Sequence, residues 1–554
     1  MDYKKEYKRW LENVKDPELL EQLKAMDEAT IEDAFYRDLA FGTGGLRGTI
    51  GAGTNRMNIY VVAKASQGLS RYLLEHYSSP SVVIGYDSRI KSDVFSKTAA
   101  SVFAANGITV HIWPELNPVP TVSYAVRKLE ASAGVMITAS HNPSKYNGYK
   151  VYGSDGCQIT TEAAAEILEH INALDIFADV HTTEFNEWIK TDKIQYIDGS
   201  VLTDFIEEVK SQSVLFGDEI NRDVAIVYSP LNGTGLIPVT RALSESGFTN
   251  ITVVEEQKLP DGNFPTCPYP NPEIREAMEL GLQYCRKTGA DLLLATDPDA
   301  DRCGIAVRNG EDYQLLSGNE VGLLLLDYIC SQRVKHNRMP EDPVFIKTIV
   351  TMDLAEKIAE HYGVQTINVL TGFKFIGEQI GRLPDEHSYI CGFEESYGYL
   401  TGSYVRDKDA VNAAFMVAEM FAFYKTRGIS LLDKLSELYR EYGYCLNTLH
   451  SYEFPGSSGM TKMAEIMKSF HDGLSFIAGM KVISTEDYSV GLNGLPKSDV
   501  LKYFYQSDAA SGSVVIRPSG TEPKLKAYIS VTASSADKAQ EIEKQIKADI
   551  EQKM

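Results

Sequence analysis

The sequence predicts an α/β fold, organised as three related α/β domains followed by a smaller α+β domain. Short apolar, β-branched runs alternate with longer stretches of helical pattern, which is typical of βαβ units and a largely parallel sheet. Three apolar strands, near Val82, Val224 and Val344, each run into a polar loop. The spacing of this weak self-similarity is far longer than the roughly 20–50 residues of solenoid repeats, so it indicates related domains.

One helix and strand of the first domain can be followed residue by residue. Apolar residues recur at helical spacing over 92–107, where Ser92 or Asp93 can cap the helix and Gly107 can end it. An apolar strand follows at 108–113. This order of helix and strand is the expected α/β alternation.

The C-terminal part has a different pattern, which begins at about Tyr442. A helical segment, a strand-rich stretch and a closing amphipathic helix follow one another there, which indicates a smaller α+β domain. We therefore predict four domains, with the boundaries 1–205, 206–320, 321–440 and 441–554.

Composition excludes several classes of partner. The chain has 554 residues, of which 44% are hydrophobic and 23% charged, so it can bury a large core. Its net charge is −22 and its pI about 5.0, which argues against binding to nucleic acid or to an anionic membrane. A site for an anionic substrate must therefore be locally basic.

Cysteine usage and hydropathy predict a cytoplasmic protein. The seven cysteines are scattered and never spaced CxxC, so neither a disulfide framework nor a zinc site is indicated. The N-terminus is charged, and apolar runs such as 321–326 are far shorter than a membrane span.

The stretch "AGVMITASHNPSKYN" (133–147) carries the first candidate site. "AGVMI" is a buried strand, and Ser140 lies in the loop beyond its carboxyl end, where open α/β sheets bind ligands. No GxSxG occurs, so a hydrolase nucleophile elbow is excluded. Alone, the loop could be a turn with a capping hydroxyl. Lys150, close behind it, could assist proton transfer or bind an anion, or lie solvated at the surface.

The stretch "ADLLLATDPDADRCG" carries the second candidate site. A buried strand at 292–295 delivers Asp297, Asp299 and Asp301, whose carboxylates repel one another unless a cation lies between them. An EF-hand is excluded, because arginines stand where its glycine and glutamate are required. A solvated acidic turn and an aspartyl-phosphate enzyme with Asp297 as nucleophile stay open. Mg²⁺ with open positions for phosphate or water is the favoured interpretation.

Three further motifs carry anion or hydroxyl binders. The stretch "VIRPSGTEPK" combines an arginine, hydroxyl groups and an exposed glycine N–H, which together can bind a phosphate. The alternative is a plain turn. In "YICGFEESYGYL", the strand end at 389–391 leads to Glu394 and Ser396, which could bind sugar hydroxyls or belong to a charged loop. The glycine-rich "FGTGGLRGTIG" fits neither a dinucleotide fingerprint nor a Walker A sequence. We expect a flexible loop there that presents Arg47 to an anion.

Taken in order, five motifs resemble the α-D-phosphohexomutases, the superfamily of phosphoglucomutase and phosphomannomutase. The resemblance covers nearly the whole chain and implies four domains around a central cleft, three of them related mixed α/β domains and the last a smaller C-terminal one. The motifs are "GTGGLRG", "TASHNPSKYNGYK", "TDPDADR", "GFEESYG" and "RPSGTEPK".

The resemblance also implies a role for each candidate residue. Ser140 would be the phosphoserine, and one Mg²⁺ per chain would be bound by Asp297, Asp299, Asp301 and a phosphoserine oxygen. The residues around the transferring phosphoryl group would be Arg47, His141, Lys150 and Arg302. The residues that bind the sugar and its other phosphate would be Glu394, Ser396, Lys374, Lys408, Arg517, Ser519, Gly520 and Thr521.

These residue types suit phosphoryl transfer, which depends on positioning and on stabilising charge at the equatorial oxygens. The implied reaction interconverts α-D-glucose 1-phosphate and glucose 6-phosphate through glucose 1,6-bisphosphate, which is also the activator. Water must be excluded, so domain closure is expected. Lys150 is the first candidate for proton transfer and His141 the second.

Alternatives stay open on the same scaffold. "GFEESYG" differs from the "GEMSGH" of the dual-specificity type and is closer to glucose-type loops, in a branch that also contains phosphopentomutases and glucose-1,6-bisphosphate synthase. Phosphomannomutase and phosphopentomutase activities are the nearest alternatives. An aspartyl-phosphate phosphatase that uses Asp297, or a non-enzymatic sugar-phosphate sensor, would belong to different classes. The expected partners are small sugar phosphates, with no nucleic acid and no membrane, for a monomer or homodimer.

Overall fold

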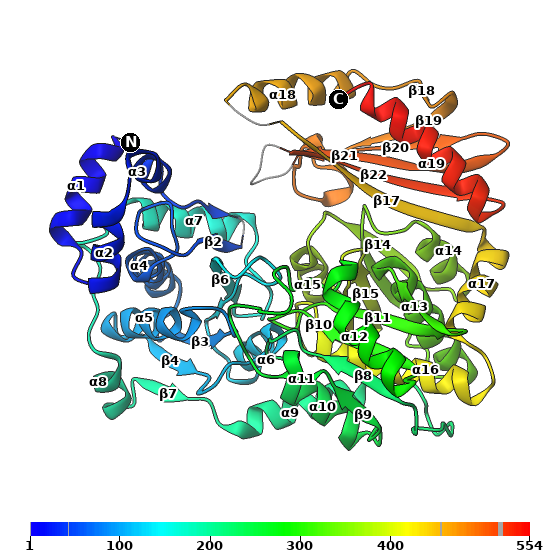
Figure 1. Cartoon of the computed structure of the whole chain (residues 1–554), viewed down its shortest axis with the longest axis horizontal. Coiled ribbons are helices and arrows are strands. Elements are labelled where there is room, and N and C mark those ends of the chain that lie inside the picture. The colour runs from blue at the N-terminus through cyan, green and yellow to red at the C-terminus, as the bar shows by residue number, and fades with distance from the viewer. Residues whose placement is uncertain (1, 43, 455–456, 519–523) are drawn as a thin grey trace. The chain divides into compact units, whose positions relative to one another are not determined.

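The structure is a computed structural model that describes residues 2–42, 44–454, 457–518 and 524–554 (Figure 1). The chain divides into two compact units. Unit 1 comprises Met1–Ser317, Phe373–Tyr389 and Ser396–Phe423, and unit 2 comprises Gly318–Gly372, Ile390–Glu395 and Tyr424–Met554. These units are coarser than the four domains expected from the sequence, whose boundaries stay a prediction.

Three short helices open unit 1, namely α1 (Tyr3–Asn13), α2 (Pro17–Ala25) and α3 (Glu28–Phe35). An aspartate caps each helix by accepting a hydrogen bond from the backbone N–H three residues further on. Trp10 of α1 is fully buried and meets the ring of Phe35 edge-on, with the ring centroids 5.6 Å apart. The helices are thus joined to the first domain's core.

The first sheet has seven strands in the order β1-β2-β6-β5-β3-β4-β7. Strands β5, β3, β4 and β7 are parallel, and β6, β2 and β1 continue the sheet in antiparallel fashion. Its strands are β1 (Phe41–Gly42), β2 (Gly45–Thr49), β3 (Ser81–Tyr86), β4 (Thr109–Ile112), β5 (Ala133–Ile137), β6 (Tyr146–Gly153) and β7 (Ile194–Tyr196). The predicted mixed α/β domain is confirmed.

Helices cover both faces of this sheet. Ile84 belongs to the core cluster shared with α4 and α5, whereas a Cβ on Gly85 or Gly134 would meet Val122 of α6 at 2.5 and 3.1 Å. Glycine at these two positions therefore allows α6 to approach closely. The helices are α4 (Ile59–His76), α5 (Ser92–Ala105), α6 (Val119–Lys128), α7 (Thr161–Asn172), α8 (Phe185–Lys190) and α9 (Gly199–Ser211).

The expected cap of α5 is wrong. The helix begins after Lys91, which has a left-handed φ of 66° and makes no side-chain cap. The hydroxyl of Ser92 instead donates to the Asp87 carboxylate at 2.8 Å, so Ser92 supports the loop before the helix.

The second sheet has the order β12-β11-β10-β8-β9, with β10, β8 and β9 parallel. Its strands are β8 (Ile226–Ser229), β9 (Ile251–Val253), β10 (Leu292–Thr296), β11 (Cys303–Asn309) and β12 (Asp312–Leu316). Its helices are α10 (Leu236–Glu245), α11 (Glu255–Lys258) and α12 (Arg275–Thr288).

Unit 1 also takes in chain from beyond residue 317. The elements are α15 (Phe373–Arg382), η1 (Glu386–Ser388), β16 (Gly398–Thr401) and most of α16 (Ala410–Thr426). Backbone hydrogen bonds attach this chain to the loop after β10, from Cys303 N to Tyr397 O at 3.0 Å and from Ala410 N to Ala300 O at 3.1 Å.

Unit 2 contains the third parallel strand pair. Strands β13 (Val344–Thr348) and β14 (Gln365–Val369) are parallel, and β15 (Tyr389–Glu394) lies on the other side of β13. The apolar run at 321–326 belongs to α13, a helix buried almost all round rather than a membrane span. The helices are α13 (Gly318–Lys335), α14 (Leu354–His361) and α17 (Leu431–Tyr442).

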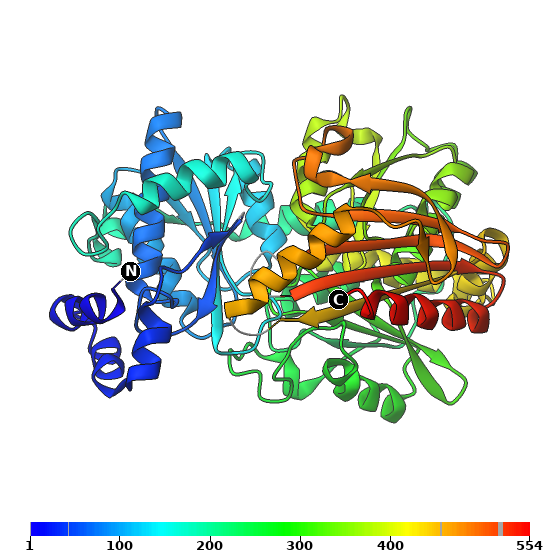
Figure 2. The same cartoon turned by 90° about the horizontal axis from the view of Figure 1, so that it is seen from above.

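A six-stranded antiparallel sheet ends unit 2, in the order β17-β22-β21-β20-β19-β18. Helices α18 (Ser457–His471) and α19 (Ala536–Glu551) lie over one face of it (Figure 2). The other elements are β17 (Tyr444–Glu453), β18 (Phe476–Ile477), β19 (Met480–Asp487), η2 (Tyr488–Val490), η3 (Leu492–Gly494), β20 (Leu501–Gln506), β21 (Ala510–Pro518) and β22 (Lys524–Ala533). The predicted C-terminal α+β domain is confirmed.

All seven cysteines are buried free thiols. Within the described ranges, no helix is both long and apolar enough to cross a membrane.

Candidate active site

Ser140 lies three residues beyond the end of β5, in a buried loop of unit 1. Its φ of 52° is in the left-handed region, which is uncommon for a residue with a side chain. Its hydroxyl lies 2.9 Å from Asp297 Oδ2 and 3.1 Å from His141 Nδ1. The two predicted strand-end motifs therefore meet at the Ser140 oxygen.

One arginine holds the backbone of the serine loop. The guanidinium of Arg89 donates to the carbonyls of Pro143 and Tyr146, each at 3.0 Å, and to those of Ser140 and Asn142. Four carbonyl acceptors on one planar group fix the loop's path.

A threonine joins the serine loop to the aspartate loop. The Thr138 hydroxyl accepts a hydrogen bond from Ser140 N at 2.8 Å and lies 2.6 Å from Asp87 Oδ2 and 3.1 Å from Asp299 Oδ2. Because one hydroxyl has a single proton, it can donate to only one of the two carboxylates at a time. These contacts support the unusual backbone conformation at Ser140.

The predicted aspartate triplet is confirmed as a spatial cluster. Asp297, Asp299 and Asp301 are almost completely buried, and one oxygen from each lies within 4.8 Å of the others. Asp297 Oδ1 also accepts from the backbone N–H groups of Asp301 and Arg302 at 3.0 and 2.9 Å. Burial and the two neighbouring carboxylates raise the pKa of Asp297 well above its ordinary value.

Two lysines compensate part of this negative charge. Lys150 Nζ lies 2.9 Å from Asp299 Oδ2 and 3.2 Å from Asp301 Oδ2, and Lys408 Nζ lies 3.1 Å from the latter oxygen. Burial opposes ionisation of Asp301, but Lys408, Lys150 and Arg302 hold its pKa well below the usual range. Burial alone would lower the pKa of Lys150, whereas the carboxylates of Asp299 and Asp301 raise it overall.

The triplet fits a hard divalent cation. Asp299 Oδ1 and Asp301 Oδ1 are buried and make no hydrogen bond within the described part of the chain. Buried carboxylate oxygens without partners are costly unless a cation coordinates them, and oxygen ligands suit Mg²⁺. The three aspartates are therefore the residues that would hold a metal.

Arg47 does not lie in a flexible loop, so that expectation is wrong. It lies in strand β2, whose register with β6 places Arg47 opposite Gly148. Its guanidinium donates to Asn142 Oδ1 at 3.1 Å, next to the serine loop. A glycine-rich sequence can thus form a strand where side-chain periodicity gives no signal.

The remaining predicted residues around the serine are also in unit 1. Burial and the nearby charges of Arg302 and Arg47 lower the pKa of His141 well below its ordinary value, which favours neutral imidazole. Arg302 follows the triplet and pairs with Glu273. The structure therefore brings Ser140, His141, Lys150, Arg47, Arg302 and Lys408 to one site.

Two further predicted residues of unit 1, Lys374 and Ser396, are each adjacent in the chain to a residue that contacts this site. Lys374 is the second residue of α15, next to Phe373, whose ring centroid lies 5.9 Å from Lys408 Nζ. Ser396 begins the segment that hydrogen-bonds to the aspartate loop through Tyr397 O.

Unit 2 holds the other predicted binding residues. Strand β15 extends to Glu394, further than the predicted strand end, and Glu394 Oε1 accepts from Gly372 N at 3.0 Å. Arg517 lies on β21 and hydrogen-bonds to Tyr528, whose pKa is raised by burial and by the nearby Glu395 and Glu394. Thus Arg517 and the carboxylates of Glu394 and Glu395 share one neighbour. Ser519, Gly520 and Thr521 lie outside the described residues.

Sequence reasoning missed several residues that build the site. Asp87 and Arg89 follow strand β3, the neighbour of β5 in the sheet, so the rule that carboxyl strand ends converge could have found them. Asp407 lies between Arg406 and Lys408 and accepts from Tyr152 OH at 2.8 Å. No local pattern signals that contact, because its partners are 255 residues apart.

Comparison with known proteins identifies the class that this fold and site define. Four family models match successive parts of the chain, and the chain belongs to the phosphoglucomutase/phosphomannomutase family. The matched models are alpha/beta/alpha domain I (residues 38–176), domain II (203–310), domain III (317–442) and the C-terminal domain (499–548).

Similar proteins extend the match over nearly the full length. A phosphoglucomutase of Staphylococcus saprophyticus is 37% identical over 546 residues, covering 95% of this chain and 97% of its own. Among solved structures, the open form of a Paramecium phosphoglucomutase, pp63/parafusin, has a TM-score of 0.71 at 18% identity, covering 94% and 95%. A phosphoglucomutase/phosphomannomutase family protein from Burkholderia thailandensis has a TM-score of 0.66 at 17% identity, covering 93% and 97%. The predicted family, fold class and enzyme class, an isomerase that transfers a phosphoryl group, are confirmed.

Proposed function

We propose that this chain interconverts α-D-glucose 1-phosphate and glucose 6-phosphate, with Ser140 as the phosphoryl carrier and glucose 1,6-bisphosphate as intermediate. The observation that carries the proposal is the 2.9 Å contact between Ser140 Oγ and Asp297 inside a buried aspartate triplet. A relative named phosphoglucomutase, 37% identical over nearly the whole chain, supports the choice of sugar.

The cofactor would be one Mg²⁺ per chain, held by Asp297, Asp299, Asp301 and an oxygen of phosphorylated Ser140. When bound, the ion offsets negative charge on the phosphoryl oxygens. Glucose 1,6-bisphosphate would serve as activator, because it can phosphorylate Ser140 in enzyme that has lost its phosphoryl group.

In the proposed reaction, a sugar hydroxyl attacks the phosphorus of phosphorylated Ser140. The bond from phosphorus to Ser140 Oγ breaks while the sugar oxygen forms the new ester bond. The sugar hydroxyl gives its proton to a nearby base, and a nearby acid supplies the proton that restores the Ser140 hydroxyl. The bisphosphate then turns over and returns its other phosphate to Ser140. Lys150 is the first candidate for proton transfer, and His141, whose Nδ1 lies 3.1 Å from Ser140 Oγ, is the second.

Positive side chains around Ser140 would stabilise the transferring group. Arg47 reaches the serine loop through Asn142, and Arg302 follows the triplet directly. Such groups stabilise charge on the equatorial oxygens, which is most of what phosphoryl transfer requires.

The substrate-binding residues are proposed one by one from the resemblance. Glu394 and Ser396 would bind sugar hydroxyls, Lys374 and Lys408 would line the site, and Arg517 would bind the phosphate that is not reacting. Ser519, Gly520 and Thr521 complete that proposed set. The shared neighbour Tyr528 supports Arg517 and the Glu394 loop acting on one substrate.

A mutase assay tests the proposal and its alternatives. The assay compares four substrates, the 1-phosphates of glucose, mannose, N-acetylglucosamine and ribose. Each reaction contains Mg²⁺ and a trace of the matching bisphosphate, and the Ser140→Ala variant is assayed in parallel. Glucose 1-phosphate should give the highest kcat/KM, and Ser140→Ala should lose at least about 10³-fold. Preference for mannose or ribose would favour the phosphomannomutase or phosphopentomutase alternative, and full activity of Ser140→Ala would overturn the mechanism.

Mass spectrometry separates the proposal from an aspartyl-phosphate phosphatase. The mutase mechanism requires an acid-stable phosphate on Ser140, whereas the phosphatase would carry a labile acyl phosphate on Asp297. Both Asp297 oxygens already accept hydrogen bonds, from two backbone N–H groups and from Ser140, which disfavours Asp297 as nucleophile.

We expect a cytoplasmic monomer or homodimer whose partners are sugar phosphates. The seven buried thiols suit a reducing compartment. Size-exclusion chromatography with light scattering measures the oligomeric state.

A further inference from the structure

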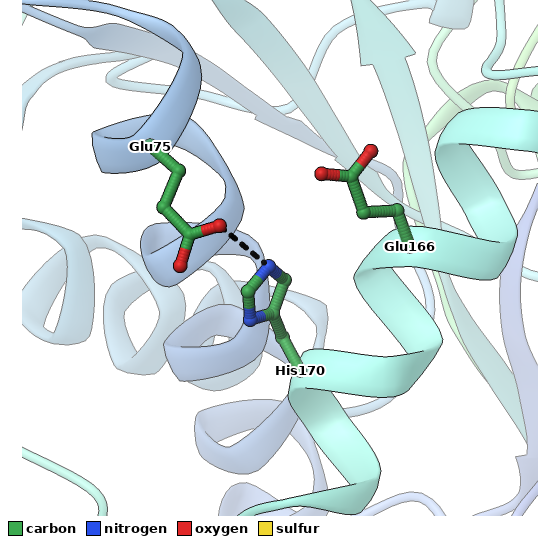
Figure 3. A group of neighbouring side chains, drawn as sticks. All are labelled: Glu75, Glu166 and His170. Carbon is green, nitrogen blue, oxygen red and sulfur yellow. Dashed lines mark ion pairs between the residues drawn. The ribbon is translucent and has the colours of Figure 1, made fainter.

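Three metal-binding side chains come together where the end of α4 packs against α7, and a fourth, His76, pairs with one of them. Glu75 and His76 are the last two residues of α4, and Glu166 and His170 are one turn apart on α7. Figure 3 shows three of them, with Glu75 and His170 pointing toward each other across the two helices. One ligand atom each from Glu75, Glu166 and His170 lies within 4.8 Å of the others.

Two of the separations match the ligand–ligand distance around a tetrahedral ion. His76 Nε2 lies 3.3 Å from Glu166 Oε1, and His170 Nε2 lies 3.4 Å from Glu75 Oε2. For metal–ligand distances of about 2.0–2.1 Å, the edge of a tetrahedron is about 3.3 Å. Each histidine is therefore already at the required distance from one glutamate, and His76 would have to turn toward the group of Glu75, Glu166 and His170 to become the fourth ligand.

The hydrogen bonding of His76 points to a cation. Its Nδ1 lies 2.8 Å from the carbonyl oxygen of Tyr72, so Nδ1 carries the proton and donates it. In neutral imidazole, Nε2 then presents a lone pair toward the Glu166 carboxylate, which is also an acceptor. Two acceptors at 3.3 Å repel each other unless a proton or a metal ion lies between them.

The site is also held in place before any ion binds. The ring of His76 stacks on Tyr72 with centroids 4.2 Å apart, and the Nδ1 contact to a backbone carbonyl is the usual second partner of a metal-bound histidine. The helices are fixed close together, because a Cβ on Gly68 of α4 would meet Ile171 of α7 at 2.4 Å.

We infer that Glu75, His76, Glu166 and His170 form a second metal site, which binds Zn²⁺. Two neutral imidazoles and two carboxylates give the four N and O ligands and the charge of −2 that suit this ion. Mg²⁺ prefers oxygen ligands only, so it belongs to the aspartate triplet instead. Bound Zn²⁺ joins the C-terminal end of α4 to α7.

Metal titration tests this inference. Untagged, metal-stripped protein is held in excess Mg²⁺ at about pH 8, where histidine is neutral, and titrated with Zn²⁺ by calorimetry and with Co²⁺ by visible spectroscopy. We expect one Zn²⁺ per chain at this site and the intense bands of tetrahedral Co²⁺. The His76→Gln/His170→Gln variant should bind one Zn²⁺ fewer, or bind it at least about tenfold more weakly, and lose those bands.

Two controls keep the test decisive. His361→Gln removes another surface histidine paired with a glutamate, His361 Nδ1 to Glu441 at 3.7 Å, and should change nothing. Asp299→Asn separates binding at the aspartate triplet from binding at α4 and α7. If the double histidine variant, shown folded by circular dichroism, binds Zn²⁺ and Co²⁺ as the unmodified chain does, the four residues form ordinary ion pairs and the inference is wrong.

Discussion

Thr138 belongs to the loop that carries Ser140, and its hydroxyl lies 2.6 Å from the carboxylate of Asp87, which follows strand β3. Thr138→Val keeps the shape but leaves Asp87 and the Ser140 N–H without this partner. Such buried groups cost about 1–3 kcal/mol when unsatisfied, so we expect that loss of stability and a lower kcat. Urea unfolding and initial rates measure the two effects. Thr138→Ser keeps the hydroxyl and should be close to the original chain, whereas an unchanged valine variant would show that the contact is dispensable.

Arg89→Lys should loosen the serine loop while keeping the positive charge. One ammonium cannot replace the planar guanidinium that donates to four carbonyls, so we expect a loss of more than about 2 kcal/mol locally. Hydrogen exchange with mass spectrometry should show faster exchange for residues 139–147. Exchange at α19, which is in the other unit, serves as the internal control. Equal protection in both proteins would mean that other contacts hold the loop.

The ion pair between Lys502 Nζ and Asp353 Oδ1, 2.8 Å apart, predicts acid sensitivity in unit 2. Burial would raise the pKa of Asp353, but Lys502 and Lys347 lower it to about 2. Because the unfolded carboxyl has a pKa of about 3.9, the stabilisation is complete above about pH 4 and disappears as pH falls toward 2. Asp353→Asn should therefore lose about 2.6 kcal/mol at pH 7 and about half of that at pH 3. Urea midpoints at both pH values measure this, and a constant difference would contradict it.

His471 predicts the opposite pH dependence in the C-terminal domain. Its imidazole lies 2.8 Å from Asp499 and 3.2 Å from Asp487, and these contacts raise its pKa against the opposing effect of burial. The contribution to stability is present below the unfolded pKa of about 6.5 and is lost as pH rises through the raised value. The thermal midpoint should exceed that of His471→Gln at pH 6 and converge with it at high pH. Asp499→Asn should reduce the difference, and parallel profiles would argue against a titrating pair.

The buried parallel strands could be predicted from the sequence, because apolar runs bounded by polar loops carry a strong local signal. Strand β5 spans Ala133–Ile137, as expected, and the aspartate triplet follows β10. Each is a local feature at the carboxyl end of a strand, but β5 and β10 belong to different sheets, so strand geometry alone could not predict that the two loops meet. The roles of Ser140 and the aspartate triplet could be assigned only from the resemblance to a family, because a serine turn or an acidic turn by itself is compatible with several functions.

The rest depended on distant parts of the chain. Arg47 was expected in a loop because its strand is rich in glycine, and its register with β6 is set about 100 residues later. The contact of Lys408 with Asp301 joins segments that no spacing rule connects. Arg89 was overlooked because a lone arginine forms no motif, although its place after β3, the neighbour of β5, could have pointed to the serine loop that it holds.

The attachment of residues 396–423 to the aspartate loop affects the order of events during protein synthesis. A ribosome that has released residue 317 has made the whole aspartate loop, but not the backbone groups of Tyr397 and Ala410 that bind it, nor Lys408. At about 5–20 residues per second, residue 423 follows about 5–20 s later. During that interval the nascent chain holds three neighbouring carboxylates with one of their cations missing. Unit 1, which holds the candidate site, is therefore completed late in translation, after much of the stretch that matches domain III (317–442) has emerged.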